Sequence, residues 1–278
     1  MAKVSVVTGG NKGIGYAICR GLAKQVGGCV ILTARNEERG LAAVAELKAE
    51  GCETLFEQLD ITDADSIRGF KERVYKKYGG IDILCNNAGI AYKNASTAPL
   101  LEKATITSET NLVGTRNVTN MLLPMMKPGG RVCQVSSMAG IINYSFPDVT
   151  NPYRLRLLSP ELTEEQVMKV MREYFVAVEN KDYTYFKKDS AYSFSKVLLT
   201  ALTRVQGRMI QSDPRGILIN CCCPGYVDTD MTSHKGPLTV DEGAKTPLMV
   251  CQLPPDCVTN GEFFKEEKHF NWEANCFY

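Results

Sequence analysis

Two side chains in the last third of the chain could move a proton. Tyr192 and Lys196 are four residues apart in the segment 190–211, whose pattern predicts a helix, so both lie on one face of it. A free phenol has a pKa of about 10, too high for efficient proton transfer at neutral pH, and an adjacent ammonium group lowers it. The same spacing is common by chance on exposed helices, so the rest of the chain must support this interpretation.

A glycine-rich stretch near the start of the chain could hold a phosphate. Apolar residues 4–7 predict a buried strand, and the residues up to about 25 predict a helix. Gly9, Gly13 and Gly15 lie between the two, where they let the backbone turn and approach a pyrophosphate at the positive end of the helix. Ordinary strand–helix turns also need glycine, but this context favours dinucleotide binding.

The composition is that of an ordinary globular protein. The 278 residues carry a formal net charge of +1 and are 44% hydrophobic, which suffices for one large α/β domain. No basic stripe indicates nucleic acid or an anionic membrane, and no window reaches the roughly 18 apolar residues of a membrane span. The core strand starts at Val4 and leaves no room for a leader, so we expect a cytoplasmic protein without nucleic-acid or membrane partners.

The cysteines indicate small buried residues. There are 11 of them, an odd number in a long chain, and many lie in apolar segments, which favours free thiols over disulfides. No Cys-x-x-Cys pair occurs, and His234 and His269 are the only histidines. We therefore expect no metal site.

Strand and helix patterns alternate along most of the chain. Strands are predicted at 4–7, 29–34, 54–59, 81–85, 131–135 and 217–222, helices at 38–50, 63–78, 107–126, 190–211 and 240–252, and an edge strand at 261–264. The alternation predicts a doubly wound parallel sheet with helices on both faces. Ligands of such sheets bind at the carboxyl ends of the strands, where four polar residues gather: Arg35, Asp60, Asn87 and Ser137.

Residues 138–190 interrupt this rhythm. The segment is more polar and too short for a core of its own, so we expect an inserted helical flap on a single domain that spans residues 1–278. A helix that opens at Ser159–Pro160 would carry four apolar residues on one face: Val167, Val170, Met171 and Val178.

Taken together, these features have the order and spacing of a known family. The chain closely resembles the short-chain dehydrogenase/reductases in Gly9-x-x-x-Gly13-x-Gly15, Asn86–Asn87–Ala88–Gly89, Asn111, Ser137, Tyr192-x-x-x-Lys196 and Pro224–Gly225. The resemblance covers nearly the whole chain and implies a Rossmann fold with a helical insertion before the catalytic tyrosine.

The resemblance implies a catalytic role for four residues. Tyr192 would protonate a carbonyl oxygen as hydride arrives from the nicotinamide, and Lys196 would lower the pKa of Tyr192 and hydrogen-bond the nicotinamide ribose. Ser137, rather than Ser136, would hold the substrate oxygen. Asn111 would anchor a water that passes protons to Lys196, although an exposed polar helix residue is an equally good interpretation of this position.

Two basic residues near the glycine loop predict that the cofactor is NADPH rather than NADH. Folds that use NAD place an acidic residue about 20 residues past the glycine loop. Here that position is Arg35, which is 20 residues past Gly15, and Lys12 lies inside the loop. The two cations favour the 2′-phosphate of NADPH, and no carboxylate competes at the strand end.

Further cofactor contacts follow from the resemblance. Asp60 would meet the adenine amine and Asn87 the adenine ribose, with turn or strand-end caps as the alternative for both. Val227 and Thr229 would contact the carboxamide and the phosphates. The complete expected set is Gly9, Asn11, Lys12, Gly13, Ile14, Gly15, Arg35, Asp60, Ile61, Asn87, Ala88, Gly89, Tyr192, Lys196, Pro224, Gly225, Val227 and Thr229.

The insertion indicates which members of the family the chain resembles most. Ser137 and Tyr192 are 55 positions apart, more than in the commoner members. With the motifs Thr8–Gly15 and Cys222–Gly225, this is similar to the monomeric NADPH carbonyl reductases and to plant alkaloid and terpenoid reductases. The likeness implies a monomer, because the extra helices cover the face that other members use to form oligomers.

We therefore expect an NADPH-dependent reductase of aldehyde, ketone and quinone carbonyls. The expected substrate site holds Ser137, Met138, Ile141, Tyr226 and Met231, with core packing as an equal alternative for the apolar ones. Cys223 could be a reactive thiol, although buried inert cysteines are commoner. The alternatives are a narrow reductase of a steroid, prostaglandin or alkaloid ketone, and a non-catalytic NADPH-binding redox sensor, which the complete catalytic set disfavours.

Overall fold

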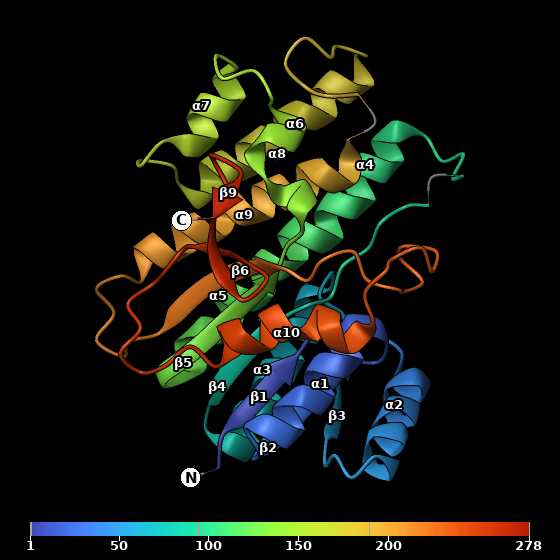
Figure 1. The fold of residues 1–278 in the computed structure, drawn as a ribbon, viewed down its shortest axis with the longest axis vertical. Coiled ribbons are helices and arrows are strands. Elements are labelled where there is room, and N and C mark those ends of the chain that lie inside the picture. The colour runs from blue at the N-terminus through green and yellow to red at the C-terminus, as the bar shows by residue number, and fades with distance from the viewer. Residues whose placement is uncertain (1, 94, 189, 278) are drawn as a thin grey trace.

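A single sheet organises the molecule. In the computed structural model, which describes residues 2–93, 95–188 and 190–277, nine strands lie in the order β3-β2-β1-β4-β5-β6-β7-β8-β9 (Figure 1). Their bounds are β1 Val4–Val7, β2 Cys29–Ala34, β3 Leu55–Gln58, β4 Ile81–Asn86, β5 Met126–Val135, β6 Leu218–Cys223, β7 Phe263–Lys265, β8 Lys268–Asn271 and β9 Cys276–Phe277. The first seven strands pair in parallel, which confirms the predicted doubly wound sheet.

Helices cover both faces of this sheet. On one face lie α1 (Gly13–Gln25), α2 (Glu37–Ala49) and α10 (Val240–Cys251), and α1 packs against α10 (Figure 1). The other face carries α3 (Ala64–Tyr78), α4 (Leu100–Ser108), α5 (Thr115–Leu122) and α9 (Ala191–Met209). Buried residues alternate between the two sides along each strand, as Val6 and Val7 of β1 illustrate. The strands are therefore apolar on both faces, as parallel strands between helical layers must be.

One predicted helix has the wrong bounds. Residues 107–126 were expected to form one helix, but α4 already begins at Leu100, and a π-helical segment, Glu109–Gly114, separates it from α5. After α5 a 3-10 turn that contains Pro124 ends the helical stretch, and β5 starts at Met126. Leu100 and Leu101 pack against the buried core, so tertiary contacts extend the helix beyond its own sequence pattern.

The segment between β5 and α9 is helical. It contains a 3-10 turn (Met138–Gly140), α6 (Ile142–Ser145), α7 (Pro152–Leu158) and α8 (Glu164–Glu179), which gather at one end of the molecule (Figure 1). The expected start at Ser159–Pro160 is wrong, because Thr163 and Gln166 form a capping box that begins α8 at Glu164. The expected apolar face is confirmed, since all four of its residues are buried: Val167, Val170, Met171 and Val178.

The sheet also continues further than expected. The segment 261–264 was predicted as an edge strand, but β7 pairs with β8, and β8 pairs with β9. Glu266 and Glu267, with φ of 51° and 58°, form the two-residue turn between β7 and β8. Glutamates are unusual in such a turn, and this is why the sequence did not reveal the hairpin.

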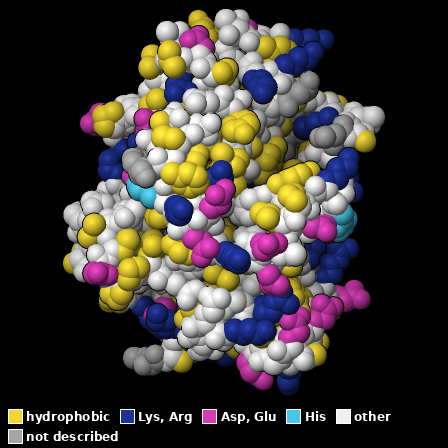
Figure 2. Space-filling model, in the orientation of Figure 1, with side chains coloured by type: hydrophobic (Ala, Val, Ile, Leu, Met, Phe, Trp, Pro, Cys, Tyr) yellow, Lys and Arg dark blue, Asp and Glu magenta, His cyan; other side chains and the backbone are white. Residues whose placement is uncertain are grey.

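Charges of both signs are interspersed on the surface. Figure 2 shows Lys and Arg next to Asp and Glu over the half that α1, α2 and α10 occupy, with apolar side chains gathered above them. In the part of the chain that the structure describes, no helix has both the length and the apolar character that crossing a membrane requires.

Candidate active site

The glycine loop forms an open cradle. Gly9 and Gly13 have φ of +62° and +56°, a region that side chains other than glycine rarely adopt. The loop leads directly into α1, and among the described residues no side chain caps the start of that helix at Lys12. The first N–H groups of α1 thus remain available, and with the helix dipole they favour an anion such as a pyrophosphate.

Thr8 and Asn87 fix the shape of this cradle. The Thr8 hydroxyl accepts hydrogen bonds from the backbone N–H groups of Asn87 and Ala88, both at 3.0 Å. The Asn87 amide donates to the carbonyl oxygens of Thr8 and Gly9 at 3.0 and 3.1 Å. Asn87 therefore braces the loop, which matches its alternative as a strand-end cap. Sequence reasoning missed Thr8, although its place directly before Gly9 is the signal for it.

Gly15 is the tightest point of the cradle, and a side chain there is expected to distort it. A Cβ at this position would lie 2.3 Å from the Gly9 carbonyl oxygen and 2.4 Å from Asn87 Nδ2. Gly15→Ala should lower the free energy of unfolding by about 1–3 kcal/mol and weaken NADPH binding, as measured by urea unfolding and fluorescence titration. Gly69→Ala, in α3, is the control, because only the flexible end of Arg73 lies near that position. Equal NADPH affinity in the two variants would contradict the cradle.

The loop after β6 packs against the glycine cradle. The methyl carbon of Thr229 lies 3.4 Å from where a Cβ of Gly13 would be. Lys12 Nζ forms an exposed ion pair with Asp230 Oδ2 at 2.6 Å. His234 binds Asp228 at 2.7 Å and Asp230 at 3.2 Å, and these carboxylates, Asp228 foremost, raise the pKa of His234. Asp230 was not expected, because nothing in the sequence places it beside a residue 218 positions away.

Arg35 stands at the end of β2 with its side chain exposed. Its backbone carbonyl accepts a hydrogen bond from Gln58 Nε2 at 2.9 Å. The guanidinium group itself has no hydrogen bond or ion pair to any residue that the structure describes. It is thus available for a phosphate, whereas Lys12 already has a carboxylate partner.

The next strand end carries a turn cap. Asp60 Oδ1 accepts hydrogen bonds from the backbone N–H and the hydroxyl of Thr62, at 2.9 and 2.7 Å. This is the arrangement that the turn-cap alternative predicts for Asp60. The neighbouring Ile61 is buried and packs closely against Gly114. An adenine contact at Asp60 would have to use its other carboxylate oxygen.

The start of α9 brings the catalytic candidates together. Lys196 is buried, and its Nζ donates to the Val135 carbonyl oxygen at 2.7 Å. The same nitrogen lies 5.9 Å from the centre of the Tyr192 ring. The Ser137 side chain lies near that of Tyr192, because hydrogen bonding from Ser137 lowers the pKa of Tyr192. The three residues thus meet where β5 ends and α9 begins.

The structure overturns one electrostatic expectation. Lys196 was expected to lower the pKa of Tyr192, but burial raises it to about 12, against the smaller lowering effect of the Ser137 hydrogen bond. Burial also lowers the pKa of Lys196 to about 8. The physical reason is that loss of water around the buried phenol disfavours its charged form by more than hydrogen bonding from Ser137 favours it. Tyr192 therefore keeps its proton at neutral pH in the free protein, which is the form that a proton donor needs.

The two neighbouring serines have different surroundings. The Ser136 hydroxyl is buried and bonds to Thr200 Oγ1 at 2.9 Å. Ser137 faces Tyr192, and its Oγ also accepts from the Ala139 backbone N–H at 3.1 Å. The geometry thus favours Ser137 as the residue that holds a substrate oxygen.

Asn111 is a fully buried member of the site. It lies in the π-helical segment, and such segments occur frequently at functional sites. Its amide accepts from the Ile90 N–H at 2.8 Å and donates to the Ile90 carbonyl oxygen at 2.9 Å and to Ser195 Oγ at 3.1 Å. This burial excludes the alternative of an exposed helix residue. A Cβ on Gly89 would lie 3.1 Å from Asn111 Oδ1 and 3.6 Å from Lys196 Nζ, so the three positions adjoin.

The apolar substrate candidates divide into two groups. Tyr226 and Met231 are 52% and 42% exposed, and Met138 is partly buried, so all three keep accessible surface. Ile141 is fully buried in the core, which favours its packing alternative.

Cys223 has the surroundings of an inert thiol. Its sulfur accepts from the backbone N–H groups of Met138 at 3.2 Å and Gly225 at 3.3 Å. Burial raises its pKa to about 11. The side chain therefore ties the turn after Ser137 to the Pro224–Gly225 loop, and a low thiolate content at neutral pH disfavours reactivity.

Comparison with known proteins identifies the family. The family model described as short chain dehydrogenase matches residues 3–149, and the chain belongs to this family. "Carbonyl reductase [NADPH] 1" of Bos taurus is 42% identical over 276 residues, covering 97% of this chain and 98% of that protein. "Carbonyl reductase [NADPH] 3" of Rattus norvegicus is 41% identical, covering 98% and 99% of the two chains.

Solved structures agree on the architecture. Salutaridine reductase from Papaver somniferum superposes with a TM-score of 0.84 at 31% identity, covering 95% of this chain and 99% of that one. Menthone neomenthol reductase from Mentha piperita gives a TM-score of 0.80 at 28% identity with the same coverage. The fold is therefore that of a Rossmann-type oxidoreductase.

Proposed function

We propose that this protein reduces aldehyde and ketone carbonyls, quinones included, to alcohols with NADPH. The observation that carries the proposal is the meeting of Tyr192 and Lys196 at the end of β5, beside Asn111 and Gly89. The likeness to the two carbonyl reductases over nearly the whole chain supports the same activity. The cradle fits a dinucleotide, because a Cβ would be crowded at Gly9 and Gly15, Gly13 has a positive φ, and the start of α1 is uncapped.

The chain's own residues would divide the work as follows. The N–H groups at the start of α1 bind the pyrophosphate, and Arg35 and Lys12 bind the 2′-phosphate. Ser137 holds the substrate oxygen against Tyr192, whose hydroxyl gives its proton to that oxygen. Lys196 positions the nicotinamide ribose, and Asn111 holds a water on the path to Lys196. Bound NADPH supplies the hydride that the carbonyl carbon takes up.

The test follows NADPH absorbance with a panel of quinones, aromatic aldehydes and steroid ketones, with NADH in parallel. We expect turnover of many carbonyls and a strong preference for NADPH. NADPH binding without turnover of any carbonyl would contradict the proposal and favour a redox sensor.

A narrow ketone reductase is the second candidate. It is supported by the structural likeness to the salutaridine and menthone neomenthol reductases, named for single ketones. The exposed Tyr226 and Met231 would then select the substrate. Turnover confined to one class of the panel would favour this candidate.

NADPH affinity is expected to fall at alkaline pH. Lys196 has a pKa of about 8 in the free protein, and its charged form is the one that would donate to both the nicotinamide ribose and the Val135 carbonyl oxygen, beside a cofactor that carries negative phosphates. Above pH 8, binding must therefore take up a proton, so the Kd for NADPH should rise by up to about tenfold per pH unit. Lys196→Met should bind NADPH more weakly with a flat profile over the same range. A Kd of the unsubstituted protein that does not change between about pH 7 and about pH 9.5 would contradict this role.

The proposal includes a monomer that works in the cytoplasm without nucleic-acid or membrane partners. We infer a single domain over residues 1–278, with 138–190 as a helical flap beside the substrate site. α8 of this segment packs against α4 and α9, the helices that would otherwise be free to meet a second subunit. Light scattering tests this point: a mass near twice 30.7 kDa would contradict the monomer.

A further inference from the structure

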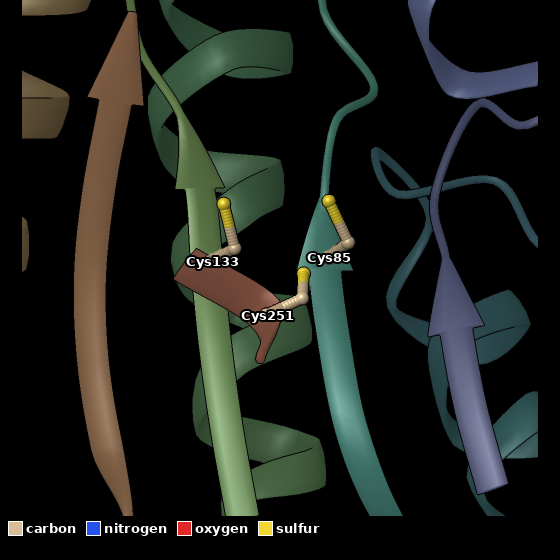
Figure 3. A group of neighbouring side chains, drawn as sticks. All are labelled: Cys85, Cys133 and Cys251. Carbon is tan, nitrogen blue, oxygen red and sulfur yellow. The ribbon is translucent and has the colours of Figure 1, made fainter. Parts of the chain in front are cut away.

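Three cysteines from distant parts of the chain meet inside the core. Cys85 on β4 and Cys133 on β5 are direct neighbours in the sheet, and Cys251 is the last residue of α10, which crosses the same face. Figure 3 shows Cys251 between the two strands with its sulfur pointing the same way as the other two. The cofactor cradle and the catalytic candidates use none of these side chains.

The sulfurs are spaced for a shared central atom. All three Sγ atoms lie within 4.8 Å of one another. Bonds from thiolate sulfur to a soft ion are about 2.3 Å long, so three sulfurs around one ion lie about 3.5–4.0 Å apart. Small side-chain adjustments would bring the three sulfurs from their present spacing to the spacing that one ion requires. Cys133 also has a fourth sulfur as a neighbour, because its Sγ lies 3.6 Å from that of Cys222.

The surroundings restrict what could bind. Each cysteine is fully or almost fully buried, and the shared core around them is built of apolar residues such as Val135 and Leu248. The group of ligands contains only sulfur, which excludes hard ions such as Mg²⁺ and Ca²⁺. A divalent ion on three thiolates would leave one net negative charge in this core, and an uncompensated buried charge is costly. A trivalent ion on three thiolates leaves none.

We propose that Cys85, Cys133 and Cys251 form a three-thiol site for trivalent arsenic, taken up as arsenous acid. Three S–H groups and As(OH)₃ give As(S–Cys)₃ and three molecules of water. Three As–S bonds form, three As–O bonds break, each thiol proton leaves with a hydroxide, and no oxidation state changes. The product is neutral, as the apolar core requires.

Binding would join three elements of the fold. The arsenic would link β4, β5 and the end of α10, so it should stabilise the native state by mass action. Because the thiols are buried, uptake must await local opening of the α10 end and should be slower than reaction at the exposed Cys276.

Mass spectrometry provides the test. The three less buried cysteines, Cys29, Cys257 and Cys276, are first replaced by serine to remove competing thiols. This background protein is incubated with arsenous acid to equilibrium, and the adduct is weighed. We expect a gain of one arsenic atom less three hydrogens, together with a higher melting temperature. An adduct that keeps a hydroxyl on arsenic, or no adduct, would overturn the proposal.

Two variants in this background locate the site. Cys251→Ala should lose the three-thiol adduct, whereas Cys221→Ala should keep it, because Cys221 is equally buried but lies in the core on the other side of β6. Loss of the adduct in both variants, or in neither, would contradict the assignment.

A second measurement uses the unsubstituted chain and so does not depend on any variant's folding. After incubation with arsenous acid the chain is unfolded in urea and alkylated, and the unmodified cysteines are mapped. Cys85, Cys133 and Cys251 should be protected as a group. Protection of any other group of buried cysteines would overturn the proposal.

Discussion

Tyr192→Phe is expected to lose about 10²–10⁴-fold in kcat for carbonyl reduction while it keeps its affinity for NADPH. The hydroxyl is the group that would give its proton to the substrate oxygen, and Ser137 beside it lowers its pKa. Burial keeps this hydroxyl protonated up to about pH 12, so the unsubstituted protein holds the donor form throughout the neutral range. Phenylalanine preserves the ring above which the Lys196 ammonium lies, so the packing and the ammonium position should persist.

Steady-state kinetics measure kcat, and NADPH fluorescence titration measures the Kd separately. Tyr75→Phe is the matched control, since Tyr75 is an exposed tyrosine on α3, far from the site in sequence and structure. We expect Tyr75→Phe to leave both kcat and Kd unchanged. Turnover of Tyr192→Phe within a few-fold of the unsubstituted protein would contradict the assignment of the proton donor.

Local patterns in the sequence were sufficient for most of the fold. The apolar strands with β-branched residues, the glycines before α1 and the four-residue spacing of Tyr192 and Lys196 each depend on a few adjacent residues. Strand order then follows from right-handed crossovers, which bring the polar strand ends to one edge. Both the sheet and the place of the candidate site could therefore be predicted.

Features set by tertiary contacts could not be predicted. α4 begins at Leu100 because that residue packs on the distant α8–α9 core, and the β7–β8 hairpin forms around two glutamates that rarely make such turns. The pKa of Tyr192 depends on how deeply the ring is buried and on where the Lys196 ammonium donates, and neither is written in the spacing of the two residues. The pairing of Lys12 with Asp230 likewise needs the folded chain.

The ion pair between Lys12 and Asp230 changes how much Lys12 and Arg35 should each contribute to the affinity for NADPH. An exposed pair is worth little, but a 2′-phosphate must compete with Asp230 for Lys12, whereas the Arg35 guanidinium has no partner to give up among the described residues. We therefore expect Arg35 to carry more of the preference for NADPH than Lys12, a ranking that could not be predicted before the ion pair was known.

Arg35→Ala is accordingly expected to raise the Kd for NADPH by about tenfold to hundredfold, the usual loss for charge-assisted hydrogen bonds to a phosphate. The Kd for NADH should stay the same, because NADH lacks the 2′-phosphate. Lys12→Ala should cost less, and Asp230→Asn should tighten NADPH binding by about two- to threefold by releasing Lys12.

Fluorescence titration of both cofactors against each variant gives this ranking directly. Arg172→Ala provides the control for a lost surface arginine, because Arg172 lies on α8 and pairs with Glu165. Raising the salt concentration should shrink the differences among the variants for NADPH and leave NADH nearly unaffected, since exposed charges are screened. If Arg35→Ala weakened NADPH and NADH equally, the guanidinium would be supporting the fold of the β2 end, and recognition of the 2′-phosphate would fall to Lys12 alone.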